Sequence, residues 1–429
     1  MKDLLNFLDS SPVNYLAVET LRKRLLGAGF EQLDATMPLG DMKAGRQFFV
    51  TKNGSSLYAF RIGEAPLADG GFHMICSHCD SPTFRIKPNA EMCGEGGITR
   101  LNTEVYGGPI MSTWLDRPLS LAGRVILKTD CAMEPQVKLL HVKRPLLQIS
   151  NLAIHFNRQV NEGVKLSKQK DMLPLLGFVT DEMEKGKMLE RIICEELRCQ
   201  PADILDFDLY LYDATPSCLF GAHEEMISSG RLDDLSMVHA SLAALLSAVN
   251  PTPCVTQVMA VFDNEETGSQ TKQGAGSPFL ASLLRRIVFA QGGTEEDYWR
   301  SVENAFMISA DNAHAWHPNY PEKYDPTNHP VLGGGPVIKF NAAQKYASDA
   351  YSAAVFASIC EKAHVPCQKF VNHSDVAGGS TLGNILASSL PVCGVDMGNP
   401  ILAMHSARET GAVKDHEYCI EAFTCFYQS

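Results

Sequence analysis

Residues 255–269, VTQVMAVFDNEETGS, place an apolar run directly before a group of acidic side chains. The run from Val255 to Phe262 has the length and composition of a buried strand, and a polar turn with Gly268 follows it. The carboxyl ends of strands in an open α/β sheet form the edge where ligands bind. We therefore expect Glu265 and Glu266 to lie at a ligand-binding edge.

Apolar runs of strand length alternate with runs of helical spacing on both sides of this stretch. Upstream, the spacing predicts a helix over 13–28, a hairpin around Asn53-Gly54 and a strand over 71–76. Downstream, it predicts helices over 235–249, 278–290, 349–362 and 382–389, and strands over 305–308 and 391–395. This alternation implies a layered α/β sheet.

Between residues 85 and 228 the pattern changes to short β-like pieces separated by Gly, Pro and Asn. LSLAGRVILK at 119–128 and DFDLYLYD at 206–213 are examples. We interpret this region as an inserted β-rich module. The chain then divides into a first part of the α/β domain at 1–84, the insertion at 85–228, and the second part of the α/β domain at 229–429.

The composition excludes several classes of partner. A formal net charge of −12 repels polyanions, so we expect neither nucleic acid nor an anionic membrane as a partner. The first residues, MKDLLNFLDSSP, are too acidic for a secretory segment, and no apolar stretch reaches the ~18 residues of a membrane span. The thirteen cysteines are scattered, which is typical of reduced thiols and predicts a cytoplasmic location.

Four other segments share the design of a His or a carboxylate in a polar loop after an apolar run. They contain His78 with Asp80, Asp233 with Asp234, Asp311 with His314 and His317, and His405. Each has a structural explanation when taken alone. His78 has the features of a hydrogen-bonded core histidine, Asp233-Asp234 those of a helix N-terminus, and Glu265-Glu266 those of a solvated turn. Together they favour a cation, because buried strand ends rarely carry so many ionisable groups without one.

Imidazoles and carboxylates in this number fit a paired site for zinc-like ions, with one carboxylate shared between the two ions. Neighbouring side chains at a strand end point apart. One member of the Glu265-Glu266 pair can therefore bind metal while the other takes a proton from the attacking water. This division of labour is typical of a hydrolase.

Two motifs favour other chemistry, and we reject both. Cys76 and Cys79 form a C-x-x-C, the spacing of redox and zinc-ribbon motifs, but no second pair of suitable spacing follows. The glycine runs LGGGPVIK and AGGSTLGN lack the spacing and the strand-to-helix context of nucleotide-binding loops. We interpret them as tight turns that line a cleft.

The segments HCDSP, RLDD, DNEETGS, SADNAHAWHPNYPEKY, GPVIK and AMHSARE resemble, in this order, the motifs of the M18 metallopeptidases, the aspartyl aminopeptidases. The resemblance covers nearly the whole chain. It implies a three-layer α/β/α catalytic domain of the zinc-aminopeptidase type, interrupted by a β-rich dimerisation domain. It also implies two divalent metal ions; we expect zinc, with manganese and cobalt as alternatives that accept the same ligands.

The resemblance assigns a role to each matched residue. The implied metal ligands are His78, Asp233, Glu266, Asp311 and His405. Asp233 would bridge the ions, His78 and Asp311 would complete one shell, and Glu266 and His405 the other. Glu265 would act as the general base, and Asp80 would orient the His78 ring.

The resemblance also implies substrates and partners. The substrates would be peptides with N-terminal Asp or Glu, and Lys339, assisted by His317, would bind the acidic side chain. Self-association would produce dimers and a tetrahedral homododecamer, with His155 of the LAIHF segment reaching a neighbouring subunit's site. Without the resemblance, His155 is interpreted as an ordinary strand histidine and Lys339 as a surface charge.

Two other functions stay open. A dimetal hydrolase of another amide or ester bond would use the same ligands. A non-catalytic assembly or cargo protein that retains the fold is less favoured, because Glu265 would then serve neither folding nor metal binding.

Overall fold

The computed structural model describes residues 1–93, 96–179, 187–247 and 253–429. The chain forms two compact units, which are described separately. The first unit contains Met1–Asp80, Ser217–Met404 and Glu409–Ser429, and the second contains Ser81–Pro216 and His405–Arg408.

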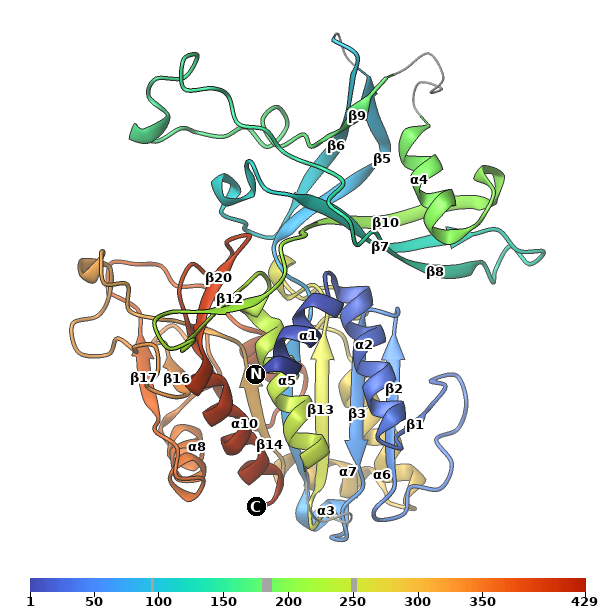
Figure 1. Ribbon diagram of the computed structural model, residues 1–429. Coiled ribbons are helices and arrows are strands. Elements are labelled where there is room, and N and C mark those ends of the chain that lie inside the picture. The colour runs from blue at the N-terminus through green and yellow to red at the C-terminus, as the bar shows by residue number, and fades with distance from the viewer. Residues whose placement is uncertain (94–95, 180–186, 248–252) are drawn as a thin grey trace. The chain divides into compact units, whose positions relative to one another are not determined.

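A nine-stranded mixed sheet forms the centre of the first unit (Figure 1). Its spatial order is β1 (Glu31–Gln32), β2 (Gln47–Lys52), β3 (Ser56–Arg61), β13 (Thr256–Phe262), β4 (Phe72–His78), β14 (Phe306–Ala310), β18 (Cys393–Gly398), β16 (Val337–Phe340) and β17 (Gln368–Val371). The central strands β13, β4, β14 and β18 are mutually parallel. Their carboxyl ends therefore meet at one edge.

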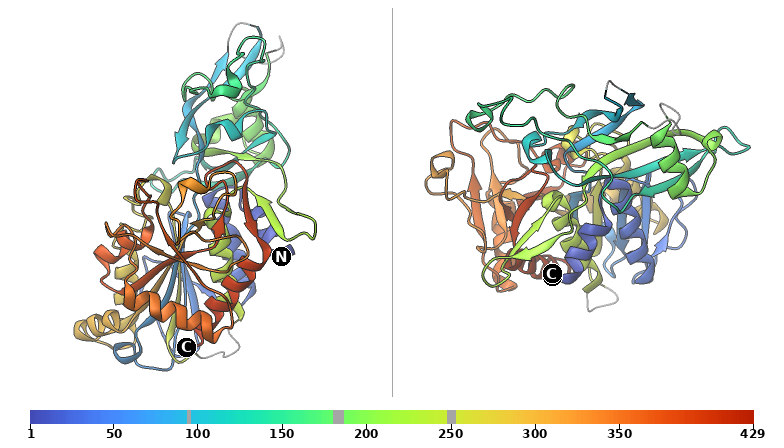
Figure 2. Two further views of the ribbon diagram at one scale, coloured as in Figure 1. Left: turned by 90° about the vertical axis from the view of Figure 1, so that its left-hand side faces the viewer. Right: turned by 45° about the horizontal axis from the view of Figure 1, so that its top comes forward.

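Helices cover both faces of this sheet, as the left view of Figure 2 shows. One face carries α1 (Lys2–Ser10), α2 (Asn14–Gly27), α5 (Leu232–Ser247), α8 (Ala350–Lys362) and α10 (Val413–Tyr427). The other carries α3 (Leu67–Gly70), α6 (Phe279–Ala290), α7 (Glu295–Glu303) and α9 (Leu382–Ser389). Strand side chains alternate between the two cores: Ile75 of β4 joins the first, and Met74 and Cys76 join the second. The predicted α/β/α layering is thus confirmed.

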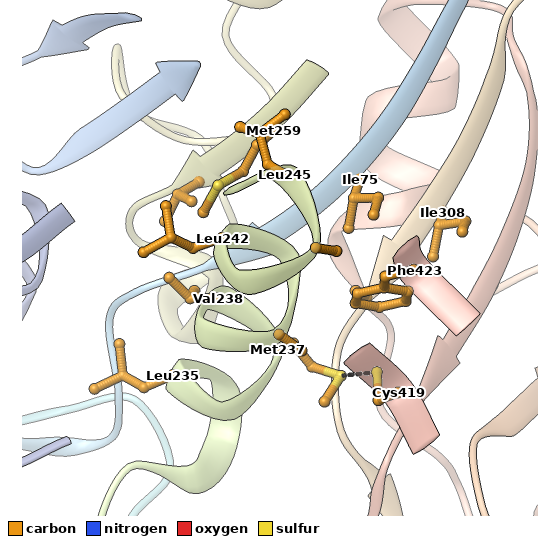
Figure 3. Packing of buried hydrophobic residues seen from close by; sticks show 14 of the residues in the cluster. Ile75, Leu235, Met237, Val238, Leu242, Leu245, Met259, Ile308, Cys419 and Phe423 are labelled. Carbon is orange, nitrogen blue, oxygen red and sulfur yellow. Dashed lines mark hydrogen bonds between the residues drawn. The ribbon is translucent and has the colours of Figure 1, made fainter. Parts of the chain in front are cut away.

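Helix α5 is apolar on nearly every side because it lies between the sheet and α10. Figure 3 shows Val238 and Leu242 on one side of the helix and Met237 directed toward α10. The Met237 Sδ atom lies 3.9 Å from the Cys419 Sγ atom of α10. Phe423 of α10 is fully buried in the same core. This packing fixes α5, whose first turn contains Asp233 and Asp234.

The predicted elements of the first unit are confirmed, with small shifts at their ends. The hairpin joins β2 to β3, and Asn53 and Gly54 both have positive φ, 58° and 67°, as this tight turn requires. The predicted helix over 235–249 is α5, and its residues 248 and 249 lie outside the described residues. Helices α1, α3, α7 and α10 of this unit were not predicted.

A small three-stranded sheet belongs to the first unit and includes the residues that follow the second unit in the sequence. It contains β11 (Cys218–Phe220), β12 (Met226–Ser229) and β20 (Glu409–Ala412), and β12 pairs with β20 in antiparallel register. The boundary that we predicted after residue 228 therefore lies at Pro216, because these strands pair within the first unit. A two-stranded ladder of β15 (Ala313–His314) and β19 (Pro400–Ile401) follows the central strands.

The second unit is built on a six-stranded antiparallel sheet. Its order is β8 (Gln136–His141), β7 (Leu119–Leu127), β10 (Ile204–Asp213), β5 (Thr83–Cys93), β6 (Ile98–Tyr106) and β9 (Leu175–Phe178). Helix α4 (Met188–Leu197) packs on it through a separate apolar core that includes Trp114 and Leu209. Among the described residues of either unit, no helix is long and apolar enough to cross a membrane.

Replacing Phe423 by alanine should destabilise the first unit strongly. The fully buried ring would leave a cavity between α10 and the sheet, at a cost of about 3–5 kcal/mol in the free energy of unfolding. Urea denaturation measures this loss. The control is Phe289→Ala: the Phe289 side chain on α6 is 44% exposed, so its removal should cost at most about 0.5 kcal/mol. Equal midpoints for the two variants would contradict the packing.

Candidate metal centre

Ionisable residues converge at the carboxyl edge of the parallel strands. Phe262, the last residue of β13, pairs with His78, the last residue of β4, and Ala310 ends the neighbouring strand β14. The residues that follow these three strand ends therefore lie at one edge of the sheet. The sequence predicted this convergence from apolar runs that lead into polar loops.

His78 is buried, and both of its ring nitrogens face oxygen atoms. Its Nδ1 atom lies 3.1 Å from the carbonyl oxygen of Asp80 and 3.4 Å from the Asp80 Oδ1 atom. Its Nε2 atom lies 3.8 Å from the Asp233 Oδ1 atom. An Nδ1–H that donates to Asp80 leaves the Nε2 lone pair directed toward Asp233, as a metal ligand requires.

Asp80 holds the turn that follows β13. Its two carboxylate oxygens accept hydrogen bonds from the backbone N–H groups of Glu265 and Glu266, each 3.1 Å long. These glutamates begin a single 3₁₀ turn, η4 (Glu265–Thr267), after Asn264, which has a positive φ of 62°. One carboxylate therefore positions both glutamates.

Asp233 and Asp234 precede the regular part of α5. Their backbone angles are non-helical, and the peptide bond between them is cis. The Asp233 N–H donates to Glu409 Oε2 at 3.1 Å, and the Asp234 Oδ2 atom accepts from the His78 N–H at 3.1 Å. The pair therefore has features of both predicted roles: it lies at the start of a helix, and it also lies beside His78, as a cation site requires.

Asp311 follows β14 and is paired with Lys339 of β16. The Lys339 Nζ atom lies 3.1 Å from the Asp311 Oδ1 atom, and Lys339 is only 3% exposed. Burial alone would lower the pKa of Lys339, but the Asp311 carboxylate raises it, so the side chain stays charged. The interpretation of Lys339 as a solvated surface charge is wrong.

These residues form groups with the spacing of metal ligands. Within each of two groups, the ligand atoms lie within 4.8 Å of one another: His78, Asp233, Asp234 and Asp311, and His78, Glu265 and Glu266. Burial, together with neighbouring carboxylates, raises the pKa of Glu265 to about 8. Burial also raises the pKa values of Glu266 and Asp234 well above their usual range.

The donor set fits divalent cations. Carboxylates brought together in a buried place resist ionisation, and the raised pKa values of Glu265, Glu266 and Asp234 express that cost. The positive charge of a divalent ion would offset the cost of ionising these carboxylates. One imidazole with several carboxylate oxygens is a mixed N and O set, which zinc accepts.

The remaining candidates are His405, His155 and His317. His405 belongs to the second unit, where its Nδ1 atom lies 3.2 Å from the carbonyl oxygen of Gly108. His155 lies in an exposed turn of that unit, so its interpretation as a strand histidine is wrong. His317 is half-buried; its ring contacts Tyr320 and its Nδ1 accepts from the Asn319 N–H.

The C-x-x-C cysteines are both buried, but they lie in different cores. Cys76 packs in the core on one face of the sheet and Cys79 in the core on the other. The Cys79 thiol donates to the carbonyl oxygen of Ser55 at 3.1 Å. This separation agrees with our rejection of a redox or zinc-ribbon motif.

Two residues of the site were missed in the sequence. Glu409 accepts the Asp233 N–H, and Asn312 donates from Nδ2 to the Leu232 carbonyl oxygen at 2.7 Å and to Asp234 Oδ1 at 3.4 Å. Both stand inside motifs that we quoted, AMHSARE and SADNAHAW. Only their membership of those motifs could have indicated a role.

Comparison with known proteins identifies the family to which this chain belongs. Residues 7–427 match the model of the family described as aminopeptidase I zinc metalloprotease (M18). A probable M18 family aminopeptidase 2 of Clostridium acetobutylicum is 50% identical over 99% of this chain and 98% of its own length.

Solved structures agree with the sequence comparisons. The cryo-EM structure of the Ape4 and Nbr1 complex matches with a TM-score of 0.95 and 36% identity, covering 100% of this chain and 85% of that chain. The mApe1 dodecamer of S. cerevisiae matches with a TM-score of 0.86 and 26% identity, covering 99% and 95%. The chain therefore belongs to the M18 family of zinc metalloprotease aminopeptidases, which are hydrolases that act on peptides.

Proposed function

We propose that the protein is a two-metal aminopeptidase that removes acidic N-terminal residues from peptides. The observation that carries the proposal is the convergence of His78, Asp233, Asp234 and Asp311, whose ligand atoms lie within 4.8 Å of one another. Asp233 would bridge two ions, with His78 and Asp311 on one of them. Glu266 and His405 would hold the other. Zinc is the expected metal, and manganese and cobalt are the alternatives.

Bound zinc supplies a Lewis acid that polarises the scissile carbonyl and acidifies the attacking water. Glu265 then accepts the proton of that water on its carboxylate and delivers it to the leaving amine. Three features support this role. Glu265 is only partly buried, it adjoins Glu266, and its backbone is held by Asp80. Asp80 and its carbonyl oxygen also orient the His78 ring.

Substrate preference is the finer part of the proposal. Lys339 is a charged residue beside the metal centre and would bind the carboxylate of an N-terminal Asp or Glu, with help from His317. Its 3.1 Å contact with Asp311 gives it a second task, since the ammonium also holds a proposed metal ligand. The two tasks are separable by experiment.

The second unit is proposed to mediate dimerisation, with dimers assembling into a tetrahedral homododecamer. The exposed LAIHF turn supports a protein contact, because Leu152, Ile154 and Phe156 are 56%, 52% and 82% exposed. His155 in this turn would reach a neighbouring subunit's site. The mApe1 relative is a dodecamer. We also propose a cytoplasmic location, which rests on the scattered cysteines of the sequence.

Glu265→Gln should reduce kcat by about 10²- to 10⁴-fold with little change in KM, because the amide cannot accept the proton. Steady-state kinetics on aminoacyl substrates would measure this, with metal content determined in parallel. The matched control is Glu64→Gln, an exposed glutamate outside the centre. Full activity of Glu265→Gln with its metal retained would refute the base assignment.

Asp233→Asn should lose metal and activity together, because one carboxylate is proposed to serve both ions. Elemental analysis after dialysis should find two zinc ions per wild-type chain and fewer than one in the variant. Asp130→Asn, at an exposed position of the second unit, should retain both. Two ions in Asp233→Asn would exclude a bridging role, and wild-type activity that survives chelation would exclude metal dependence.

Lys339→Met separates the two tasks of the lysine. If the ammonium binds the substrate, kcat/KM for Asp- and Glu-peptides should fall about 10- to 100-fold more than for Leu-peptides, the loss expected for one charged hydrogen bond. If it only holds Asp311, all peptides should lose the same factor. Equal turnover of Asp- and Leu-peptides by the wild-type enzyme would refute the acidic preference itself.

A further inference from the structure

Two buried histidines lie outside the proposed metal centre. The His239 Nδ1 atom of α5 lies 3.0 Å from the His416 Nε2 atom of α10. On its other side, the His239 Nε2 atom lies 2.9 Å from the Asp3 Oδ2 atom of α1, and Asp3 is also bound by Arg24 at 2.9 Å. His239 and His416 are 4% and 2% exposed. Aminopeptidase chemistry gives this pair no role.

The partners of these rings determine where their protons lie. Burial lowers the pKa of His416 well below its usual value, and burial lowers that of His239 despite the nearby Asp3, so both rings are neutral at pH 7. The Asp3 carboxylate only accepts, so His239 carries its proton on Nε2. His239 Nδ1 is then an acceptor and takes the Nε2–H of His416. The Nδ1 atom of His416 is left as a bare acceptor.

A small cavity borders His416. It offers about 10 Å³ to the centre of a water-sized sphere, which is just enough for one water molecule. Its lining includes Ser236, Asn399, Ile401 and Gly411. In the part of the chain that the structure describes, neither His416 Nδ1 nor Asn399 Oδ1 has a hydrogen-bond partner, although both atoms are buried. Two buried acceptors beside a cavity of this size favour a donor inside it.

Ser236, another lining residue of the cavity, is hydrogen-bonded to a neighbour of the proposed metal ligands. Ser236 Oγ lies 3.0 Å from Asn312 Nδ2 and 3.2 Å from Asn312 Oδ1. When Ser236 accepts the shorter of these bonds, its own proton is available to the cavity. The two hydrogens of Asn312 Nδ2 face three acceptors, namely Ser236 Oγ, the Leu232 carbonyl oxygen at 2.7 Å and Asp234 Oδ1 at 3.4 Å, so the bond to Asp234 shares its hydrogen with another of these acceptors. The other Asp234 oxygen accepts the His78 N–H.

We propose that one ordered water molecule occupies this cavity, donates to His416 Nδ1 and Asn399 Oδ1, and accepts from Ser236 Oγ. The water completes a chain of hydrogen bonds from Asp3 through His239, His416, Ser236 and Asn312 to Asp234, and this chain positions the carboxylates beside His78. The water site stands on the cavity and its polar lining. The positioning role rests in addition on the proposed metal centre.

Gly411→Ala tests the water site, because a bound water and a dry cavity predict changes in Tm of opposite sign. A Cβ atom at Gly411 would meet Leu232 Cδ1 at 3.4 Å and Ile401 Cγ2 at 3.6 Å, which are ordinary contacts inside the cavity, and the residue lacks a positive φ. The methyl group should expel the water and leave two buried acceptors unpaired. We expect Tm to fall by about 2–4 °C. In a dry cavity the same methyl group would fill space and raise Tm.

Gly27→Ala is the matched control. Gly27 ends α2, its Cβ would meet nothing within 4 Å, and alanine favours the helix, so Tm should rise slightly. A rise for Gly411→Ala similar to that for Gly27→Ala would overturn the water site. So would a high-resolution crystal structure of the wild-type enzyme without density within hydrogen-bond distance of His416 Nδ1 and Asn399 Oδ1.

Metal affinity tests the positioning role separately. Gly411→Ala should raise the apparent Kd for zinc about 3- to 10-fold in a competition assay with a chromogenic chelator, less than the ~10- to 100-fold caused by losing a direct partner of a ligand. An unchanged Kd, with water density present and Tm lowered, would overturn the positioning role. Absence of zinc binding by the wild type would refute the metal centre, while the Tm and density results would still decide the water site.

Discussion

Negative charge buried at the carboxyl edge of the parallel strands is the constraint on which this structure depends. Asp80, Asp233, Asp234 and Asp311 are all at most 7% exposed. Apolar cores on both faces of the sheet hold the strand ends together, and these side chains are buried beside them. Hydrogen bonds from backbone N–H groups, the Lys339 ammonium and the proposed ions offset the free-energy cost of burying these carboxylates.

Much of the first unit could be predicted because its signals are local. The strand before Glu265 ends in the continuous apolar run from Val258 to Phe262, and α9 occupies the predicted residues 382–389. The hairpin turn needs only Asn53 and Gly54. The boundary at Pro216 depends instead on pairing between β12 and β20, which are almost two hundred residues apart in the chain, and no local pattern reports such a pairing.

The same distinction holds within the candidate site. His78, Asp311, Glu265 and Glu266 each follow an apolar run, so their convergence could be predicted from strand ends. The contact between Lys339 and Asp311 could not, because it arises where β16 runs antiparallel to β18, next to β14. Asn312 was missed for a similar reason: its partners Leu232 and Asp234 belong to a different element.

Asp80 accepts from two consecutive amides, and this shared anchor has a consequence for how the enzyme is controlled. Any local opening that frees the turn after Asn264 releases the proposed proton acceptor Glu265 and the proposed metal ligand Glu266 in a single event. In the proposed mechanism, one carboxylate then couples catalytic competence to ion retention. An agent that loosened this turn would inactivate the enzyme without occupying the space where the peptide binds.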